Sequence, residues 1–147
     1  MIKSLVILFT AFHFLFSINW ENDFSKAKQT AATDHKYILL NFSGSDWCGP
    51  CIRLHKEIFE TADFTAFANE HLVLVNADFP RQKKNQLSKA MQQQNDQLAE
   101  KYNTSGNFPY TLLLSPDGKI IQAWDGFPKQ GAVGFINELK QAIHAGN

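Results

Sequence analysis

The order of apolar and polar positions along the chain predicts alternating strands and helices. Short apolar runs bounded by turn signals indicate strands, while apolar residues three or four positions apart indicate one buried face of a helix. The predicted strands are residues 37–43, 72–77, 110–114 and 120–124. The predicted helices are residues 23–33, 49–59, 63–70 and 83–102, followed by a closing helix marked by Ala132, Ile136, Leu139 and Ile143. This order, βαβ followed by ββα, predicts an α/β sandwich with a mixed sheet.

The run of residues 37–43 is almost continuously apolar, which is typical of a central strand buried on both faces. Residues 110–114 and 120–124 flank Pro116-Asp117-Gly118, a turn signal that predicts a β-hairpin. A chain of 147 residues is long enough to bury a proper core as one domain.

The N-terminus differs from the rest of the chain. Lys3 is followed by an almost uncharged apolar stretch from Ser4 to Ile18, the pattern of a secretory signal peptide. The stretch is too short for a comfortable membrane span. We therefore expect a signal peptide over residues 1–19, with its cleavage site undefined, and one domain over residues 20–147. The alternatives are a retained membrane anchor and a buried N-terminal element. Export predicts a periplasmic or secreted location, which permits disulfides.

The charge pattern argues against one class of partner. The chain has 14 basic and 14 acidic residues and no block of one sign, so no nucleic-acid-binding surface is expected. Arg81, Lys83 and Lys84 form the only basic cluster, and we interpret them as the solvated start of the helix at residues 83–102.

The two cysteines of the chain lie in one segment, Cys48-Gly49-Pro50-Cys51. Two thiols one helical turn apart at the start of a helix are suited to reversible disulfide exchange. The N-terminus of a helix stabilises a thiolate, so the pKa of Cys48 is expected below the roughly 8.5 of a free thiol. We expect Cys48 to be the nucleophile and Cys51 the resolving thiol. Pro50 suits a first helical turn, and Gly49 leaves Cys48 uncovered to an incoming disulfide.

Two other uses of a Cys-x-x-Cys segment fit the sequence poorly. Structural zinc needs about four ligands, and His55 could supply at most a third. A covalent haem site needs a histidine directly after the second cysteine, where this chain has Ile52. We therefore expect neither a metal nor a cofactor.

Trp47 followed by Cys48-Gly49-Pro50-Cys51 after a strand resembles the active-site signature of the thioredoxin family. Phe108-Pro109, ahead of Thr111-Leu112-Leu113-Leu114, resembles the cis-proline strand of that family. The resemblance extends from about Asp23 onward. The segments 42–47 and 115–119 resemble its secreted branch. The fold implied is the thioredoxin fold, a mixed central β-sheet flanked by helices on both faces.

The resemblance also implies a substrate-binding groove beside the dithiol. Its residues are Trp47, Gly49, Pro50, Phe108 and Pro109, with a cis peptide at Pro109 that exposes backbone to a substrate strand. Trp47 could also be ordinary core packing, and Pro109 an ordinary strand boundary.

Other residues near the dithiol are open to more than one interpretation. Trp124 and Phe127 could line the same groove or pack in the core. We interpret His55 as a surface histidine rather than a proton carrier. Asp46 would raise the pKa of Cys48 if the two lie close together.

One position departs from the family pattern. Thioredoxins carry a buried aspartate in the strand before the motif and a lysine on the neighbouring strand. The nearest equivalents here are Asn41 and Leu74. Because asparagine does not titrate, we assign no general base.

These features give two hypotheses of different class. The first is an exported thiol–disulfide oxidoreductase that acts on protein disulfides. We favour a reductase because Gly-Pro between the cysteines resembles reducing members, and such relatives imply a membrane thiol electron donor. We expect the protein to be a monomer. The alternative is a redox-sensitive peptide-binding module without catalytic turnover. A pure binding module has no need of two exchangeable thiols.

Overall fold

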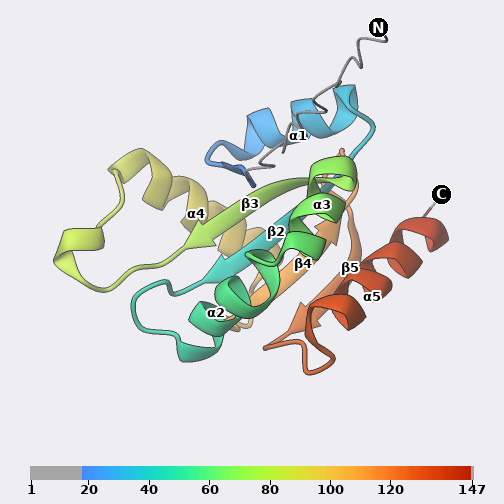
Figure 1. The fold of residues 1–147 in the computed structure, drawn as a ribbon. Coiled ribbons are helices and arrows are strands. Elements are labelled where there is room, and N and C mark those ends of the chain that lie inside the picture. Colours follow the sequence, from blue (N-terminus) through green and yellow to red (C-terminus); the bar gives the residue numbers. More distant parts are fainter. Residues whose placement is uncertain (1–17, 147) are drawn as a thin grey trace, which may run out of the picture.

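A computed structural model describes residues 18–146 and places their strands in one mixed sheet (Figure 1). The strand order is β1-β3-β2-β4-β5. β1, β3 and β2 are parallel, while β4 and β5 are antiparallel to their neighbours. The strands are β1 (Trp20–Glu21), β2 (Tyr37–Ser43), β3 (Leu72–Asp78), β4 (Tyr110–Leu114) and β5 (Ile120–Asp125). The predicted thioredoxin fold is therefore confirmed.

Helices cover both faces of the sheet (Figure 1). Their bounds are α1 (Phe24–Thr33), α2 (Gly49–Leu54), α3 (Ala62–His71), α4 (Lys89–Tyr102) and α5 (Gly131–Ala145). One apolar cluster joins α2, α3 and α5 to Leu39 and Leu113 of the sheet. The other joins α1 and α4 to Leu40 and Leu112. Successive side chains of β2 and β4 thus enter opposite clusters, which explains their nearly continuous apolar sequences.

The predicted helix at residues 83–102 is wrong in its first third. Lys83–Asn85 form only a short 3₁₀ turn, η2, and α4 begins at Lys89. The Ser88 hydroxyl caps α4 by accepting a hydrogen bond from the Met91 N–H at 3.3 Å. Serine is a favoured N-cap because its side chain satisfies a free helix donor. The basic cluster at residues 81–84 therefore lies in the loop between β3 and α4 and not at the start of that helix.

The helix after the cysteines is not a uniform α-helix. It continues from Leu54 into a π-helical segment, η1 (His55–Phe59), where the Glu60 N–H bonds to the His55 carbonyl. The neighbours Ile58 and Phe59 are both buried. π-helical turns are rare and are often found at functional sites. Neither the π-helical segment η1 nor the two-residue strand β1 has a periodic pattern of apolar residues that would predict it from the sequence.

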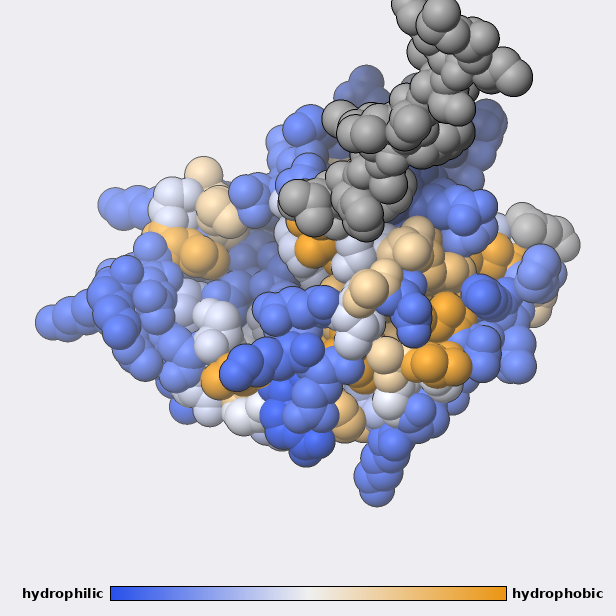
Figure 2. Space-filling view, viewed as in Figure 1, coloured by the Kyte–Doolittle hydropathy of each residue, from blue (hydrophilic) through white to orange (hydrophobic). Residues whose placement is uncertain are grey.

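The predicted signal peptide falls almost entirely outside the described residues, and its interpretation stays a prediction. Within residues 18–146, no helix has the length and apolar character needed to cross a membrane. On the face shown in Figure 2 hydrophilic residues dominate, and apolar residues lie in separate patches between them.

Candidate active site

Cys48 and Cys51 form a disulfide where β2 passes into α2. Their sulfurs are 2.08 Å apart and their Cα atoms 5.2 Å apart. Cys48 is the N-cap of α2, and its Sγ accepts a hydrogen bond from the Cys51 N–H at 3.3 Å. Gly49 and Pro50 form the exposed first turn. Cys48 keeps 5 % of its surface and Cys51 only 1 %, so Cys48 is the more accessible of the two.

The peptide bond between Phe108 and Pro109 is cis, as the resemblance implied. Pro109 directly precedes β4, which pairs with β2 and so lies next to the strand that leads to the dithiol. The Trp47 ring contacts the Phe108 ring edge-on, with centroids 5.5 Å apart. The segment before the cysteines and the residue before Pro109 are thus brought together.

Trp47 is held in place on several sides. Its indole N–H donates to the Phe79 carbonyl at 2.7 Å, and the Arg81 guanidinium lies 3.8 Å from its ring. A Cβ added to Gly44 would lie 2.2 Å from the indole, so only glycine fits beneath this ring. Trp47 is half-buried, so it both packs against these groups and keeps part of its surface exposed.

Asp46 fixes the loop between β3 and α4. Its carboxylate accepts hydrogen bonds from the Arg81 and Gln82 N–H groups and from the Asn85 side chain, each at 2.9 Å. The Arg81 N–H is the main cause of the lowered pKa of Asp46, followed by Asn85. The hydrogen bonds of the Asp46 carboxylate are thus made with this loop. A cavity of about 470 Å³ lies beneath the loop, lined by Trp47 and Phe108 among others.

Asn41 lies fully buried in the centre of the sheet. Its side-chain N–H donates to Asn76 Oδ1 at 2.9 Å, and its carbonyl oxygen accepts from Thr111 Oγ1 at 3.0 Å. The strand register pairs Asn41 with Asn76 and pairs Leu39 with Leu74. The residue beside Asn41 on β3 is therefore Asn76, and Leu74 lies beside Leu39.

The polar network continues from Asn76 to a carboxylate at the end of β3. The Ser43 hydroxyl lies 3.1 Å from both Asn76 Oδ1 and Asp78 Oδ1. Asp78 also accepts from the Ser45 N–H at 2.8 Å and from its hydroxyl at 2.5 Å. Neither Asn76 nor Asp78 was among the residues predicted for the site. Their signal is one polar residue within the apolar run of β3, Asn76, and one at its end, Asp78.

His55 is not an ordinary surface histidine, and that interpretation is wrong. Its ring is half-buried between Trp20 and Phe59, with centroids 5.2 Å from each. Burial lowers the pKa of His55 below its ordinary 6.5, and nearby Glu60 and Asp78 and a hydrogen bond with Asn76 oppose this shift.

Trp124 and Phe127 both pack against the cluster under α5. The Trp124 ring meets Phe135 edge-on at 5.1 Å, and its N–H donates to Glu138 at 2.6 Å. Arg53 lies 4.4 Å over the Phe127 ring. Of the two alternatives for Trp124, the structure shows core packing. Among residues 18–146, no group of three or more histidine, cysteine, aspartate or glutamate side chains is placed to hold a metal ion.

A model of the thioredoxin-like domain matches residues 24–142. The chain belongs to the thioredoxin-like family. It is 34 % identical to disulfide bond reductase DsbH of Chlamydia pneumoniae over 127 residues, which cover 86 % of this chain and 74 % of that protein. Thioredoxin-related protein DsbJ of the same organism is 30 % identical over 71 % of this chain but only 29 % of its own length.

Solved structures agree with the family assignment. A DsbH oxidoreductase superposes with a TM-score of 0.79 at 31 % identity, covering 87 % of this chain and 85 % of that one. The oxidised C-terminal domain of Neisseria meningitidis DsbD shares the fold, with a TM-score of 0.57 at 19 % identity over 86 % of this chain and 99 % of that one. This thioredoxin-like protein is thus of the thiol–disulfide oxidoreductase class.

Proposed function

We propose that this thioredoxin-like protein is an exported reductase of protein disulfides. The observation that carries the proposal is the disulfide between Cys48 and Cys51 at the start of α2. The disulfide is the oxidised half of a dithiol couple. Its position next to the cis bond at Pro109 supports a site where a substrate disulfide is exchanged.

Cys48 attacks the substrate in this mechanism. In the reduced protein its thiolate forms a bond to one substrate sulfur and breaks the substrate disulfide, releasing one substrate thiolate. The Cys51 N–H that points at Cys48 Sγ would stabilise the attacking thiolate, because a hydrogen bond to the charged form lowers a thiol pKa. Cys51 then attacks Cys48, closes the protein disulfide and frees the second substrate thiolate.

The substrate would lie across Trp47, Gly49, Pro50, Phe108 and Pro109. A Cβ added to Gly49 would meet nothing within 4 Å, so the space above the first turn is open. The Trp47 and Phe108 rings, from the residues next to Cys48 and Pro109, contact each other edge-on. An extended substrate segment can approach the accessible Cys48 from this side.

The direction of electron flow is supported by two observations. Gly-Pro separates the cysteines, and the C. pneumoniae relative is named a disulfide bond reductase. The signal-like segment at residues 1–19 supports export, with a membrane anchor as the lesser alternative. An exported reductase needs a membrane thiol donor to reduce the Cys48–Cys51 disulfide again.

Turnover distinguishes this proposal from a redox-sensitive peptide-binding module. With dithiothreitol in excess, the protein is expected to reduce insulin over many turnovers, measured as turbidity from the released B chain. Cys51→Ser should accumulate a mixed disulfide on Cys48, visible by mass spectrometry, whereas Cys48→Ser should form none. Capture of one equivalent of peptide without turnover would support the module and exclude the reductase.

A further inference from the structure

The resolving step of the proposed reaction needs a proton acceptor, because Cys51 attacks as a thiolate. The neutral groups Asn41, Asn76 and Thr111 fill the sheet centre beneath the motif helix. None of them titrates near neutral pH. A proton acceptor must therefore be a group other than these three.

His55 follows Cys51 by one helical turn on the same segment. The backbone N–H of His55 donates to the Cys51 carbonyl at the α2–η1 junction. Residues four apart on a helix lie on one face, about 5–6 Å apart at Cβ, and helical side chains lean toward the N-terminus. His55 therefore lies on the same face of the motif helix as Cys51, one turn further along the chain.

The rings on either side give His55 a defined position. Trp20 of β1 and Phe59 of η1 each lie 5.2 Å from the imidazole, centroid to centroid. Asn76 of β3 forms a hydrogen bond with the imidazole. The ring is thus held between three elements, and it is not a mobile surface side chain.

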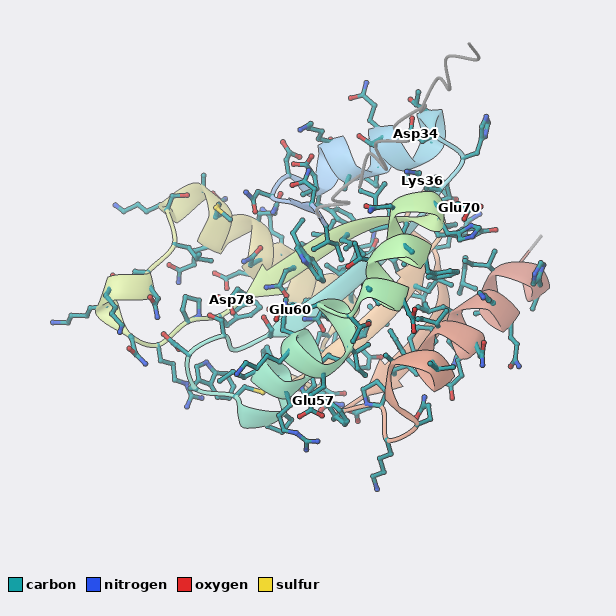
Figure 3. The ribbon with its side chains drawn as sticks, in the orientation of Figure 1. Asp34, Lys36, Glu57, Glu60, Glu70 and Asp78 are labelled. Carbon is teal, nitrogen blue, oxygen red and sulfur yellow. A yellow bond between two sulfur atoms is a disulfide. The ribbon has the colours of Figure 1, made fainter. Side chains whose placement is uncertain are left out.

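A cavity gives the same histidine a route to solvent. It has a volume of about 470 Å³, and its lining includes His55, Asn76, Asp78 and Glu60. Figure 3 labels Asp78 at the end of β3 and Glu60 just beyond η1. A water molecule takes up about 30 Å³, so this cavity is large enough for several. It can pass a proton between the imidazole and bulk solvent.

We propose that His55 is the proton acceptor for the Cys51 thiol in the resolving step, directly or through one water, and exchanges that proton with solvent through the cavity. The proposal rests on the proposed function. The imidazole nitrogen takes the proton of the Cys51 thiol, and the thiolate forms the bond to Cys48 Sγ. The Cys48–substrate disulfide bond breaks, and its electron pair leaves on the substrate sulfur. The imidazolium then returns its proton to water or to the departing thiolate.

The charges around His55 suit this task. Burial lowers its pKa, so the ring is neutral and able to accept a proton at pH 7. The acidic groups that face it are Glu60, just beyond η1, and Asp78, on β3, and both favour the imidazolium that forms transiently. The lining residues from β1 and α4 carry no titratable side chain.

The two thiol steps can be separated with Ellman's reagent in stopped flow. The first thionitrobenzoate released from the reduced protein reports attack by Cys48, and the second reports attack by Cys51. Thionitrobenzoate has a low pKa and leaves Cys48 without being protonated. The rate of the second phase therefore depends on deprotonation of the Cys51 thiol. In His55→Gln the second phase should slow about tenfold or more at pH 6–7, with the first phase unchanged. The difference should shrink as rising pH ionises Cys51 without help.

His144→Gln, at an exposed position on α5, is the matched control and should leave both phases unchanged. His55→Phe keeps an aromatic ring between Trp20 and Phe59 and should slow the second phase as His55→Gln does. Equal second phases in wild type and folded His55 variants across pH 5–9 would overturn the proposal. If the role of His55 fails in this way but the wild-type protein still reduces insulin catalytically, the proposed function stands. If the wild-type protein does not reduce insulin, the proposed function fails as well.

Discussion

At the scale of single residues, the side chains beneath the dithiol make a neutral hydrogen-bonded chain where a charge could have been placed. Asn41 is fully buried and serves as donor to Asn76 and acceptor for Thr111. Every side-chain nitrogen and oxygen buried within residues 18–146 has a hydrogen-bond partner. Because Asn41, Asn76 and Thr111 are satisfied without ionisation, none of these three side chains should change its charge near neutral pH.

Replacing Asn41 with aspartate tests this neutrality. The new carboxylate can still accept from Thr111, but its second oxygen faces the Asn76 oxygen where an N–H stood. Burial should raise its pKa above the ordinary value, so ionisation at pH 7 should lower the free energy of unfolding by about 2–4 kcal/mol. The folded variant binds a proton more readily than its unfolded chain. Its deficit relative to wild type should therefore shrink as pH falls through the folded pKa.

Urea unfolding at pH 7 and pH 4.5 measures this change. Asn137→Asp, at an exposed position on α5, should show little deficit at either pH. An Asn41→Asp deficit that is equally large at both values, or absent at pH 7, would contradict the neutral-network interpretation.

At the scale of elements, the regular pieces follow from the sequence because each satisfies one local rule. Residues 37–43 are predicted at their observed bounds, since a strand buried on both faces is almost continuously apolar. The two-residue strand β1 and the π-helical turn η1 are set by tertiary packing instead. Trp20 of β1 packs on His55 and Phe59 of η1, a contact that no periodicity predicts.

The candidate site divides in the same way. The dithiol and the cis bond at Pro109 were predictable because adjacent residues carry their signals. His55 and Asp78 were not, because they are 23 residues apart and meet only through the register of β3 against the motif helix. Residues 83–88 lie in the loop before α4 although the sequence predicts helix there, because the spacing of Leu87 and Met91 continues that of α4.

Ser88 is the residue whose cap decides where α4 begins. Ser88→Ala removes the hydroxyl that accepts from Met91, which should lower the free energy of unfolding by about 1 kcal/mol. Ser105→Ala, at an exposed position in the loop after α4, should cost much less. The pair is compared by urea denaturation. Equal costs would mean that the cap contributes nothing and that another contact fixes the helix start.

At the scale of the whole molecule, the charges around the disulfide bear on the direction of electron flow. A strongly oxidising dithiol has a reduced form that is stabilised by charge near its thiolate. In this protein Arg53 and Arg81 interact with other side chains. Arg53 bonds to Glu57 at 2.9 Å, and Arg81 lies over the Trp47 ring. Together with a neutral His55 and a neutral Asn41, this leaves the Cys48 thiolate with little stabilisation beyond the Cys51 N–H.

The reduction potential of the Cys48–Cys51 couple should therefore lie closer to the roughly −270 mV of thioredoxins than to the roughly −120 mV of a strong oxidant such as DsbA. Equilibration with graded ratios of reduced and oxidised dithiothreitol, read by alkylation and mass spectrometry, gives the value. Arg53→Lys retains the charge but loses the planar contact with Phe127, and it should leave the potential within about 15 mV of wild type, or about 0.7 kcal/mol. A wild-type value near −120 mV would reverse the proposed direction, because the disulfide of so oxidising a couple takes electrons from partner thiols, so that the partner gains a disulfide and Cys48 and Cys51 become reduced.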